Sequence, residues 1–195
     1  MYEETEEPSF IPALRERLKF ADSVLDIGCG IGVLWEQYDS KIIIGMDVHR
    51  PYLEHLVHLP RRAIPIHADA RRARELFIPR SLSAVTLIDS LEHFTKEEGL
   101  QLLNDAETIA RDQVIVFTPR GFFPQQGVDN YGLSGEQYQT HYSGWESEEF
   151  LELGYNVKVF KNFHHAENPS FVEAFGSDHP PVDAIFAWKL IHSAG

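Results

Sequence analysis

Three closely spaced glycines follow an acidic residue at the end of an apolar run, a pattern that suits the binding of a nucleoside cofactor. The segment reads V-L-D-I-G-C-G-I-G, with Asp26 two residues before Gly28 and further glycines at Gly30 and Gly32. Glycines permit a tight turn in which the main chain approaches a ligand closely. We therefore expect a parallel strand that ends here and presents its backbone to a cofactor, rather than an ordinary strand-to-helix turn without a ligand.

The frame of these glycines discriminates between two kinds of nucleoside cofactor. A dinucleotide-binding turn has the pattern G-x-G-x-x-G, which would place a third glycine at position 33. That position is Val33, and the third glycine comes one residue earlier. Together with Asp26, this frame resembles the signature of class I S-adenosylmethionine-dependent methyltransferases, an apolar strand followed by D-x-G-x-G-x-G. The resemblance implies S-adenosylmethionine as the cofactor and methyl transfer as the activity.

Acidic residues also follow the next predicted strands. Asp47 lies nineteen positions after Gly28, the separation at which a carboxylate meets ribose hydroxyls in nucleoside-binding folds. By the resemblance, Asp47 holds the ribose, Asp69 accepts a hydrogen bond from the adenine amino group, and Asp26 organises the turn near the methionine end. Each acid alone could instead cap the N-terminus of a helix. The cofactor-binding residues expected from the resemblance are Asp26, Gly28, Cys29, Gly30, Asp47, Val48, Asp69, Ala70 and Asp89.

The segment Asp89-Ser90-Leu91-Glu92-His93 contains side chains for acid–base or metal chemistry. Glu92 and His93 offer an oxygen and a nitrogen donor to a divalent cation, which would polarise a substrate hydroxyl. The segment resembles the E-x-x-E-H motif with which small-RNA terminal 2′-O-methyltransferases and ubiquinone-pathway O-methyltransferases bind a metal, together with a distant histidine. Asp89 is shorter by one methylene than the first glutamate of that motif, so the match is imperfect.

His141, in the loop expected over residues 119–144, is the candidate for the distant histidine. His93 and His141 are the candidate catalytic side chains, either as metal ligands or with one of them acting directly as a base. Methyl transfer from a sulfonium also proceeds by alignment alone, with water excluded and without a dedicated base. The sequence leaves these three mechanisms open. It places the adjacent pair His164 and His165 at the surface, because neighbouring side chains diverge on a strand.

Aromatic residues are concentrated in the same loop and at its end. They either hold an apolar or aromatic small substrate or pack the loop onto the sheet, with Trp145 anchoring the helix that follows. The sequence does not decide between these interpretations. The residues are Phe122, Phe123, Tyr131, Tyr138, Tyr142 and Trp145.

Apolar runs alternate with segments of helical spacing along the chain, which predicts an α/β fold. The resemblance refines this to a doubly wound, mostly parallel seven-stranded sheet with the last strand antiparallel. A single domain is expected over residues 1–195, with residues 1–9 flexible. The predicted strands are 23–27, 42–46, 63–67, 84–88, 113–117, 155–160 and 183–190. The predicted helices are 11–20, a short one after Gly32, 96–110 and one opening at Ser147.

The composition limits which binding partners and which cellular compartment are expected. The 195 residues include 17 Lys and Arg against 30 Asp and Glu, a formal net charge of −13 that disfavours binding to nucleic-acid backbones. Cys29 is the single cysteine, which excludes an intrachain disulfide. The absence of a signal-peptide pattern and of a membrane-spanning apolar run predicts a cytoplasmic protein without membrane contact.

We expect the methyl acceptor to be an oxygen or nitrogen of a small molecule. Two alternatives stay open on the sequence alone. The acceptor could be a macromolecule, such as a protein side chain or an RNA end, or the chain could be a non-catalytic subunit that retains a cofactor-binding fold. The acids at successive strand ends disfavour the non-catalytic alternative, because a site without a ligand has no need of them. The sequence indicates neither the oligomeric state nor the identity of the acceptor.

Overall fold

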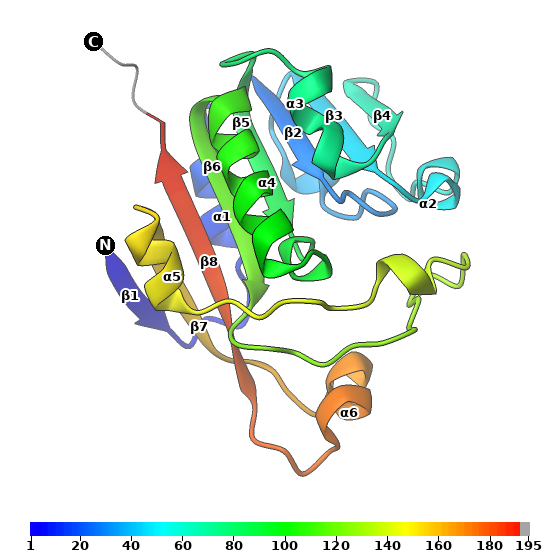
Figure 1. Cartoon of the computed structure of the whole chain (residues 1–195), viewed down its shortest axis with the longest axis vertical. Helices are drawn as coiled ribbons and strands as arrows, with labels where there is room; N and C mark the ends of the chain where they lie inside the picture. The colour runs from blue at the N-terminus through cyan, green and yellow to red at the C-terminus, as the bar shows by residue number, and fades with distance from the viewer. Residues whose placement is uncertain (192–195) are drawn as a thin grey trace.

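The computed structural model describes residues 1–191 as one mixed sheet with helices on both faces (Figure 1). The strands are β1 (Tyr2–Thr5), β2 (Ser23–Ile27), β3 (Ile42–Asp47), β4 (Ala63–His67), β5 (Leu82–Ile88), β6 (Ala110–Pro119), β7 (Asn156–His164) and β8 (Val182–Leu190). They lie in the order β1-β7-β8-β6-β5-β2-β3-β4. β8 runs antiparallel to both of its neighbours, whereas the other pairs of strands are parallel. The α/β class, the mostly parallel sheet and the antiparallel last strand are thereby confirmed.

The sheet has eight strands rather than the seven expected, because the N-terminal segment forms an edge strand. β1 pairs in parallel with β7, in a register that sets Tyr2 beside Val157 and Thr5 beside Phe160. The expectation that residues 1–9 are flexible is therefore wrong for this strand. An edge strand of polar residues buries little surface, so neither hydrophobic alternation nor an apolar run marks it in the sequence.

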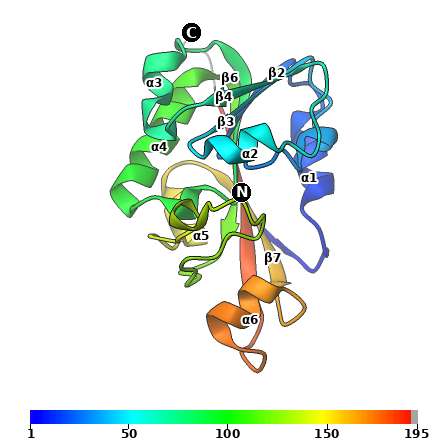
Figure 2. The ribbon, with the colours of Figure 1, turned by 90° about the vertical axis from the view of Figure 1, so that its right-hand side faces the viewer.

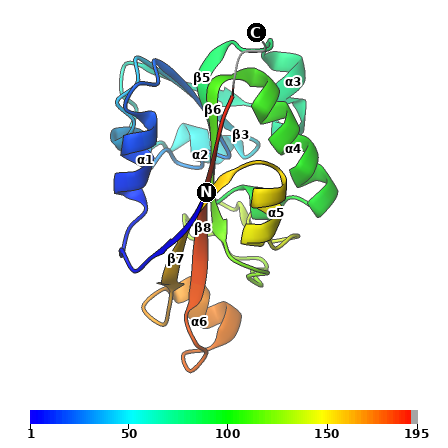
Figure 3. The ribbon, with the colours of Figure 1, turned by 90° about the vertical axis from the view of Figure 1, so that its left-hand side faces the viewer.

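Helices cover the two faces of the sheet. They are α1 (Ile11–Leu18), α2 (Arg50–Glu54), α3 (Ala73–Leu76), α4 (Lys96–Ile109), α5 (Ser147–Glu152) and α6 (Pro169–Phe175), with 3₁₀ turns η1 (Trp35–Gln37), η2 (Ala70–Arg72), η3 (Leu91–His93) and η4 (Glu136–Tyr138). α1 lies on one face and α3, α4 and α5 lie on the other, as the two side views show (Figures 2 and 3). No helix within residues 1–191 combines the length and the apolar character needed to cross a membrane.

Alternate residues of the buried strands pack on opposite faces, which divides the core into two hydrophobic clusters. In β2, Val24 shares a cluster with Leu14 of α1, whereas its neighbour Leu25 shares the other cluster with Leu103 of α4. β5 is buried along its whole length, as a parallel strand covered on both faces requires. Because both faces of the central strands are covered, a ligand can approach these strands at their carboxyl ends.

The carboxyl ends of β2, β3 and β5 meet at one edge of the sheet. After β2 the chain continues to β3 and β4 on one side, and β5 then returns to the other side of β2. Such a reversal of strand order opens a crevice, and ligands of α/β sheets bind in it. The loop from β6 to α5 and the helix α6 lie beyond these same ends of the sheet (Figure 1). The sheet topology thus provides one place for a site, which these two insertions enclose.

Candidate active site

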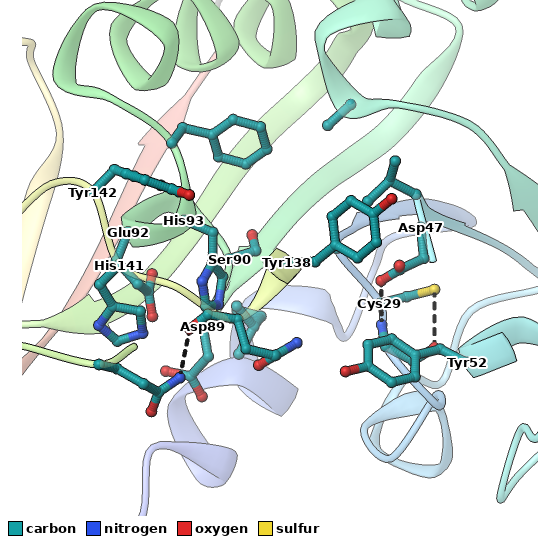
Figure 4. Close-up of a pocket in the computed structure, with 18 of the residues that line it drawn as sticks. Cys29, Asp47, Tyr52, Asp89, Ser90, Glu92, His93, Tyr138, His141 and Tyr142 are labelled. Carbon is teal, nitrogen blue, oxygen red and sulfur yellow. Dashed lines mark hydrogen bonds between the residues drawn. The ribbon is translucent and has the colours of Figure 1, made fainter. Parts of the chain in front are cut away.

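A cavity of about 680 Å³ opens at the carboxyl ends of β2, β3 and β5. Its volume lies within the range of about 300–1,000 Å³ typical of ligand pockets, and it leaves room for a second small molecule beside a nucleoside. Asp47 and Cys29 lie at one end, and Glu92, His93 and His141 lie at the other (Figure 4). Every site residue predicted from the sequence lines this cavity.

The turn after β2 requires its glycines. Gly28, Gly30 and Gly32 have positive φ angles of 74°, 54° and 73°, a region that other residues rarely adopt. A Cβ on Gly28 would also lie 2.6 Å from the Cβ of Ser90, so the turn and the start of η3 approach each other closely. The amide of Gly28 donates to the carbonyl oxygen of Met46 at 2.8 Å, which ties the turn to β3. The turn therefore presents main-chain atoms to the cavity.

Asp26 is buried beneath this turn and holds it in place. Its carboxylate accepts hydrogen bonds from Trp35 Nε1 at 3.0 Å, Tyr38 Oη at 3.1 Å and Thr86 Oγ1 at 2.7 Å. Burial raises the pKa of Asp26, and the three donors oppose this shift. Since these donors come from η1, the residue after it and β5, the carboxylate links three segments around the glycine turn. Asp26 thus fixes the conformation of the glycine turn from below.

Asp47 connects the glycine turn to the segment after β3. Its carboxylate accepts from the amides of Gly30 at 2.9 Å and His49 at 2.8 Å. Burial raises the pKa of Asp47, and these two amides oppose the shift. A carboxylate has about four lone-pair positions, so the two backbone bonds leave capacity for two ligand hydroxyls. Asp47 lies beside Cys29 (Figure 4), and the half-buried Val48 follows it along the cavity wall.

Asp69 caps the 3₁₀ turn η2, so the capping role considered for it is present in the structure. It accepts from the amide of Arg71 at 3.0 Å and also pairs with the Arg71 guanidinium, which lowers the pKa of Asp69. Arg71 in turn pairs with Glu98 at 2.9 Å. Asp69 and the buried Ala70 nevertheless line the cavity together. Capping and ligand binding are therefore compatible at this position.

Asp89 begins the segment that carries the catalytic candidates. It has a φ of 46°, the left-handed conformation that is uncommon for a residue other than glycine. Its amide donates to the carbonyl oxygen of Phe117 at 2.9 Å. Its side chain is accessible through the cavity although protein atoms surround it. This conformation turns the chain from β5 into η3, and such backbone strain clusters at functional sites.

Glu92, His93 and His141 bring their ligand atoms within 4.8 Å of one another. Nδ1 of His93 lies 3.2 Å from the carbonyl oxygen of Thr140, and Nδ1 of His141 lies 2.7 Å from that of Phe123. A carbonyl only accepts, so each Nδ1 carries the ring proton and each Nε2 keeps a free lone pair. Metal-binding histidines are oriented in this way, with the second nitrogen donating to a carbonyl or carboxylate.

Main-chain contacts bring His141 to this cluster from the loop after β6. The amides of Tyr142 and Ser143 donate to the carbonyl oxygen of Glu92 at 2.9 and 3.2 Å. The carboxylate of Glu92 accepts from Thr118 Oγ1 at 3.0 Å. η3, β6 and the loop are therefore held together at Glu92, and His141 is placed next to it in Figure 4.

Burial determines the protonation of the cluster. It lowers the pKa of His93 and lowers that of His141 to about 4, so both rings are neutral at pH 7. Burial also raises the pKa of Glu92. Two neutral nitrogen donors beside a buried carboxyl group favour a bound cation, which would stabilise the ionised carboxylate.

The loop after β6 is attached over the end of the cavity that contains Asp47 by contacts that no sequence motif indicated. Tyr52 Oη donates to Asp129 Oδ1 at 2.8 Å, and His49 Nε2 lies 2.8 Å from the carbonyl oxygen of Leu133. Asp129 Oδ2 accepts from the amide of Leu133 at 2.6 Å, which rigidifies the tip of the loop. The ring of Tyr131 lies over the glycine turn. The loop therefore forms a cover over that turn, fastened through Tyr52.

Replacing Tyr52 by phenylalanine is expected to speed the release of S-adenosylhomocysteine several-fold. The variant keeps the ring but loses the bond to Asp129, and one hydrogen bond contributes about 0.5–1.5 kcal/mol, a factor of up to about tenfold. Stopped-flow measurement of ligand release checks this. Tyr138→Phe is the matched control, because Tyr138 lines the same cavity without a side-chain hydrogen bond among the described residues. Equal release rates for Tyr52→Phe and the wild type would contradict the fastening role.

His164 does not lie at the surface, and that expectation is wrong. The side chain is buried and lines the cavity. The pairing of β7 with β8 shifts register between Phe160 and His164, and the ring of Phe123 contacts both His164 and Phe175 of α6. Alternation along a regular strand, on which the expectation rested, does not hold across such an irregularity.

Five of the six aromatic residues divide between the two roles considered for them, and the sixth, Phe122, is exposed and does not line the cavity. Trp145 is fully buried, with its ring 5.4 Å from that of Phe150 in α5 and the ammonium of Lys96 3.7 Å above it. It therefore anchors the loop to the core. Phe123, Tyr131, Tyr138 and Tyr142 line the cavity instead.

No protein-family model matches the sequence, and no curated protein matches it in a sequence comparison. Solved structures do resemble it. The methyltransferase domain of the bacterial CtHen1-C has 18% identity, a TM-score of 0.59 and coverage of 96% of this chain and 100% of its own. The plantazolicin methyltransferase BamL, in complex with a substrate analogue and S-adenosylhomocysteine, has 14% identity, a TM-score of 0.59 and coverage of 96% and 86%. A SAM-dependent methyltransferase from Archaeoglobus fulgidus has 17% identity, a TM-score of 0.55 and coverage of 92% and 94%.

The chain has the class I methyltransferase fold. At these identities the similarity establishes the fold, and the roles of individual residues follow from the geometry of this chain. In this chain the crevice at the carboxyl ends of β2, β3 and β5 is the cavity described above. The sequence did not predict the elements β1 and α6. It also did not predict the contacts that fasten the loop after β6.

Proposed function

We propose that the chain binds S-adenosylmethionine and transfers its methyl group to an oxygen or nitrogen of a small molecule. The observation that carries this proposal is the meeting of two groups at one cavity. One is the glycine turn with Asp47, and the other is the cluster of Glu92, His93 and His141. The solved structure of BamL, which has the same fold and contains S-adenosylhomocysteine, supports the choice of cofactor.

In this proposal the residues at the glycine turn bind and orient the cofactor. Asp47 accepts hydrogen bonds from both ribose hydroxyls, and Val48 packs against the adenine. Asp69 accepts from the adenine amino group, with the main chain of Ala70 beside it. The glycine turn, held from below by Asp26, contacts the methionine part together with Asp89. Methyl transfer is an in-line displacement, so this alignment and the exclusion of water by the loop after β6 provide much of the catalysis.

The same proposal assigns a divalent metal ion to Glu92, His93 and His141. The donor set fits, since one carboxylate and two neutral imidazoles are ligands suited to such ions, and both rings are oriented by bonds to carbonyl groups. A bound ion would polarise an acceptor hydroxyl and lower its pKa. His93 and His141 are therefore the proposed catalytic residues. Direct proton abstraction by one of them is the alternative that applies if no metal binds.

Calorimetry with S-adenosylmethionine and S-adenosylhomocysteine tests the cofactor assignment. We expect one site with a dissociation constant in the range of about 1 μM to 1 mM that is common for enzyme substrates. NAD⁺ is the matched control, because Val33 breaks the dinucleotide pattern. Binding of neither methionine derivative, or tighter binding of NAD⁺, would overturn the proposal.

A further inference from the structure

His164 ends β7 and lies buried at the cavity without a hydrogen-bond partner in residues 1–191. Its side chain is 8% exposed, and Nε2 meets no donor or acceptor. Nearly all buried polar atoms of native proteins have a partner, because leaving one unpaired costs free energy. Since His164 lines the cavity, a bound molecule is the natural partner for Nε2. The proposed cofactor and metal functions do not use this residue.

Phe123 forms the wall between His164 and the cluster that contains His141. Its ring centroid lies 5.3 Å from that of His164 and 5.8 Å from that of His141. Phe175 of α6 packs edge-on behind it at 5.0 Å. The backbone carbonyl of Phe123 also orients His141 at 2.7 Å. Phe123 is 4% exposed, so it offers a bound planar ring an edge contact at the cavity wall.

Three uncharged polar residues of α6 and the loop line the cavity. They are Asn168 and Ser170, at the start of α6, and Asn130 of the loop. Asn130 Nδ2 donates to Ser170 Oγ at 3.2 Å, which joins the loop to α6 above the cavity. Burial lowers the pKa of His164 to about 4, so its ring is neutral at pH 7. The lining therefore offers hydrogen bonds without a charge to pair with an ionic ligand.

No permanently positive side chain reaches this end in the part of the chain that the structure describes. Among the cavity-lining residues of that part, Arg71 is the one lysine or arginine, and it pairs with Asp69 and Glu98. Phosphates and carboxylates bind where arginine, lysine or several backbone amides face them. Within the described residues, this end of the cavity therefore lacks the cationic side chain with which proteins usually bind an anionic acceptor.

We infer that the end of the cavity bounded by Phe123, His164 and α6 binds the ring of an uncharged acceptor, positioned by a hydrogen bond to His164 Nε2. The inference rests on the proposed methyl transfer, because it names the class of molecule that receives the methyl group. The ring contacts the edge of Phe123, and its hydroxyl or amine points from there toward Glu92, His93 and His141. His164 is a positioning residue, and no proton of the reaction passes through it.

Two ring compounds of nearly equal shape test the charge preference. 4-Hydroxybenzamide is neutral at pH 7, whereas 4-hydroxybenzoate is an anion. Calorimetry of the full chain, with and without saturating S-adenosylhomocysteine, measures both. We expect the amide to bind at least about tenfold more tightly than the carboxylate.

Two variants test His164 itself. His164→Phe keeps an aromatic ring and removes the unpaired nitrogen, so it preserves the fold. His164→Gln restores a polar group near the position of Nε2. We expect the phenylalanine variant to bind the amide about tenfold more weakly and the glutamine variant to recover most of the affinity. Neither variant should change the affinity for S-adenosylhomocysteine.

The outcomes separate this inference from the proposed function. Equal binding of the carboxylate, unchanged affinity in His164→Phe, or no binding of the amide while S-adenosylhomocysteine binds would each overturn the inference. Tighter binding of a short 3′-terminal RNA than of the amide would also overturn it, in favour of a macromolecular acceptor. If the wild type binds the amide but does not bind S-adenosylhomocysteine, the proposed methyl transfer is overturned. The inferred binding of an uncharged ring beside Phe123 and His164 would still hold.

Discussion

Replacing Glu92 by glutamine is expected to weaken the binding of Mn²⁺ by at least about 100-fold, since loss of an outer-shell partner alone costs about 10–100-fold and a direct ligand contributes more. The variant removes the carboxylate and leaves the two imidazoles of His93 and His141. The affinity for S-adenosylhomocysteine should stay unchanged, because Glu92 lies at the other end of the cavity from Asp47 (Figure 4). Electron paramagnetic resonance of Mn²⁺ and calorimetry measure the two affinities.

Two further variants calibrate this experiment. Thr118→Val removes the hydroxyl that donates to Glu92 Oε2 at 3.0 Å, and we expect it to lower Mn²⁺ affinity about tenfold, as an outer-shell change does. Glu97→Gln makes the same chemical change at an exposed position of α4 and should have no effect. Equal Mn²⁺ binding by the wild type and Glu92→Gln would exclude Glu92 as a ligand and would favour a histidine base.

Replacing Asp47 by alanine is expected to weaken the binding of S-adenosylhomocysteine by about 100-fold or more. Hydrogen bonds to a charged group contribute about 1.5–3 kcal/mol each, and the proposal assigns two of them to the ribose. The substitution also frees the amides of Gly30 and His49, which the carboxylate now binds. Urea unfolding should therefore show a loss of about 1–3 kcal/mol of stability, and calorimetry is performed where the variant is still folded.

Matched variants separate the ligand contact from the backbone contacts. Asp47→Asn keeps the shape and one acceptor oxygen, so its affinity should lie between those of the wild type and the alanine variant. Asp112→Ala removes an exposed acid that pairs with Arg111 near the start of β6 and should leave the affinity unchanged. Unchanged binding in a folded Asp47→Ala variant would contradict the assignment of Asp47 to the ribose.

The sequence predicted the central strands well, and it also predicted the edge strand β4 with its observed bounds, Ala63–His67. Ile42–Met46 is a continuous apolar run, Ala84–Ile88 is apolar apart from Thr86, and each lies within a central parallel strand of the structure. A strand buried on both faces is apolar along its length, so its own residues predict its burial without information on the neighbouring strands. The resemblance implied the antiparallel last strand, and the pairing of β8 with β6 and β7 confirms it.

The elements that the sequence did not predict are those whose stability depends on distant partners. β1 is an exposed edge strand, and α6 is a short helix in a stretch that contains several prolines. β1 is held by backbone pairing with β7, and α6 packs on Phe123. Neither contact produces a periodic pattern in the residues of the element itself. His164 was misplaced for the same reason, since it follows a register shift in β7 and packs against Phe123 of the distant loop.

The sequence by itself determined the proposed cofactor-binding end of the site. Asp26 and the glycines up to Gly32 are neighbours in the chain, and a short turn has a geometry that its own residues specify. Only the tertiary structure decided the acceptor end. Glu92, His141 and His164 are far apart in sequence, and they meet because loop amides bind the Glu92 carbonyl group and α6 closes the cavity. Such long-range contacts depend on the packing of the whole sheet, which a local pattern does not record.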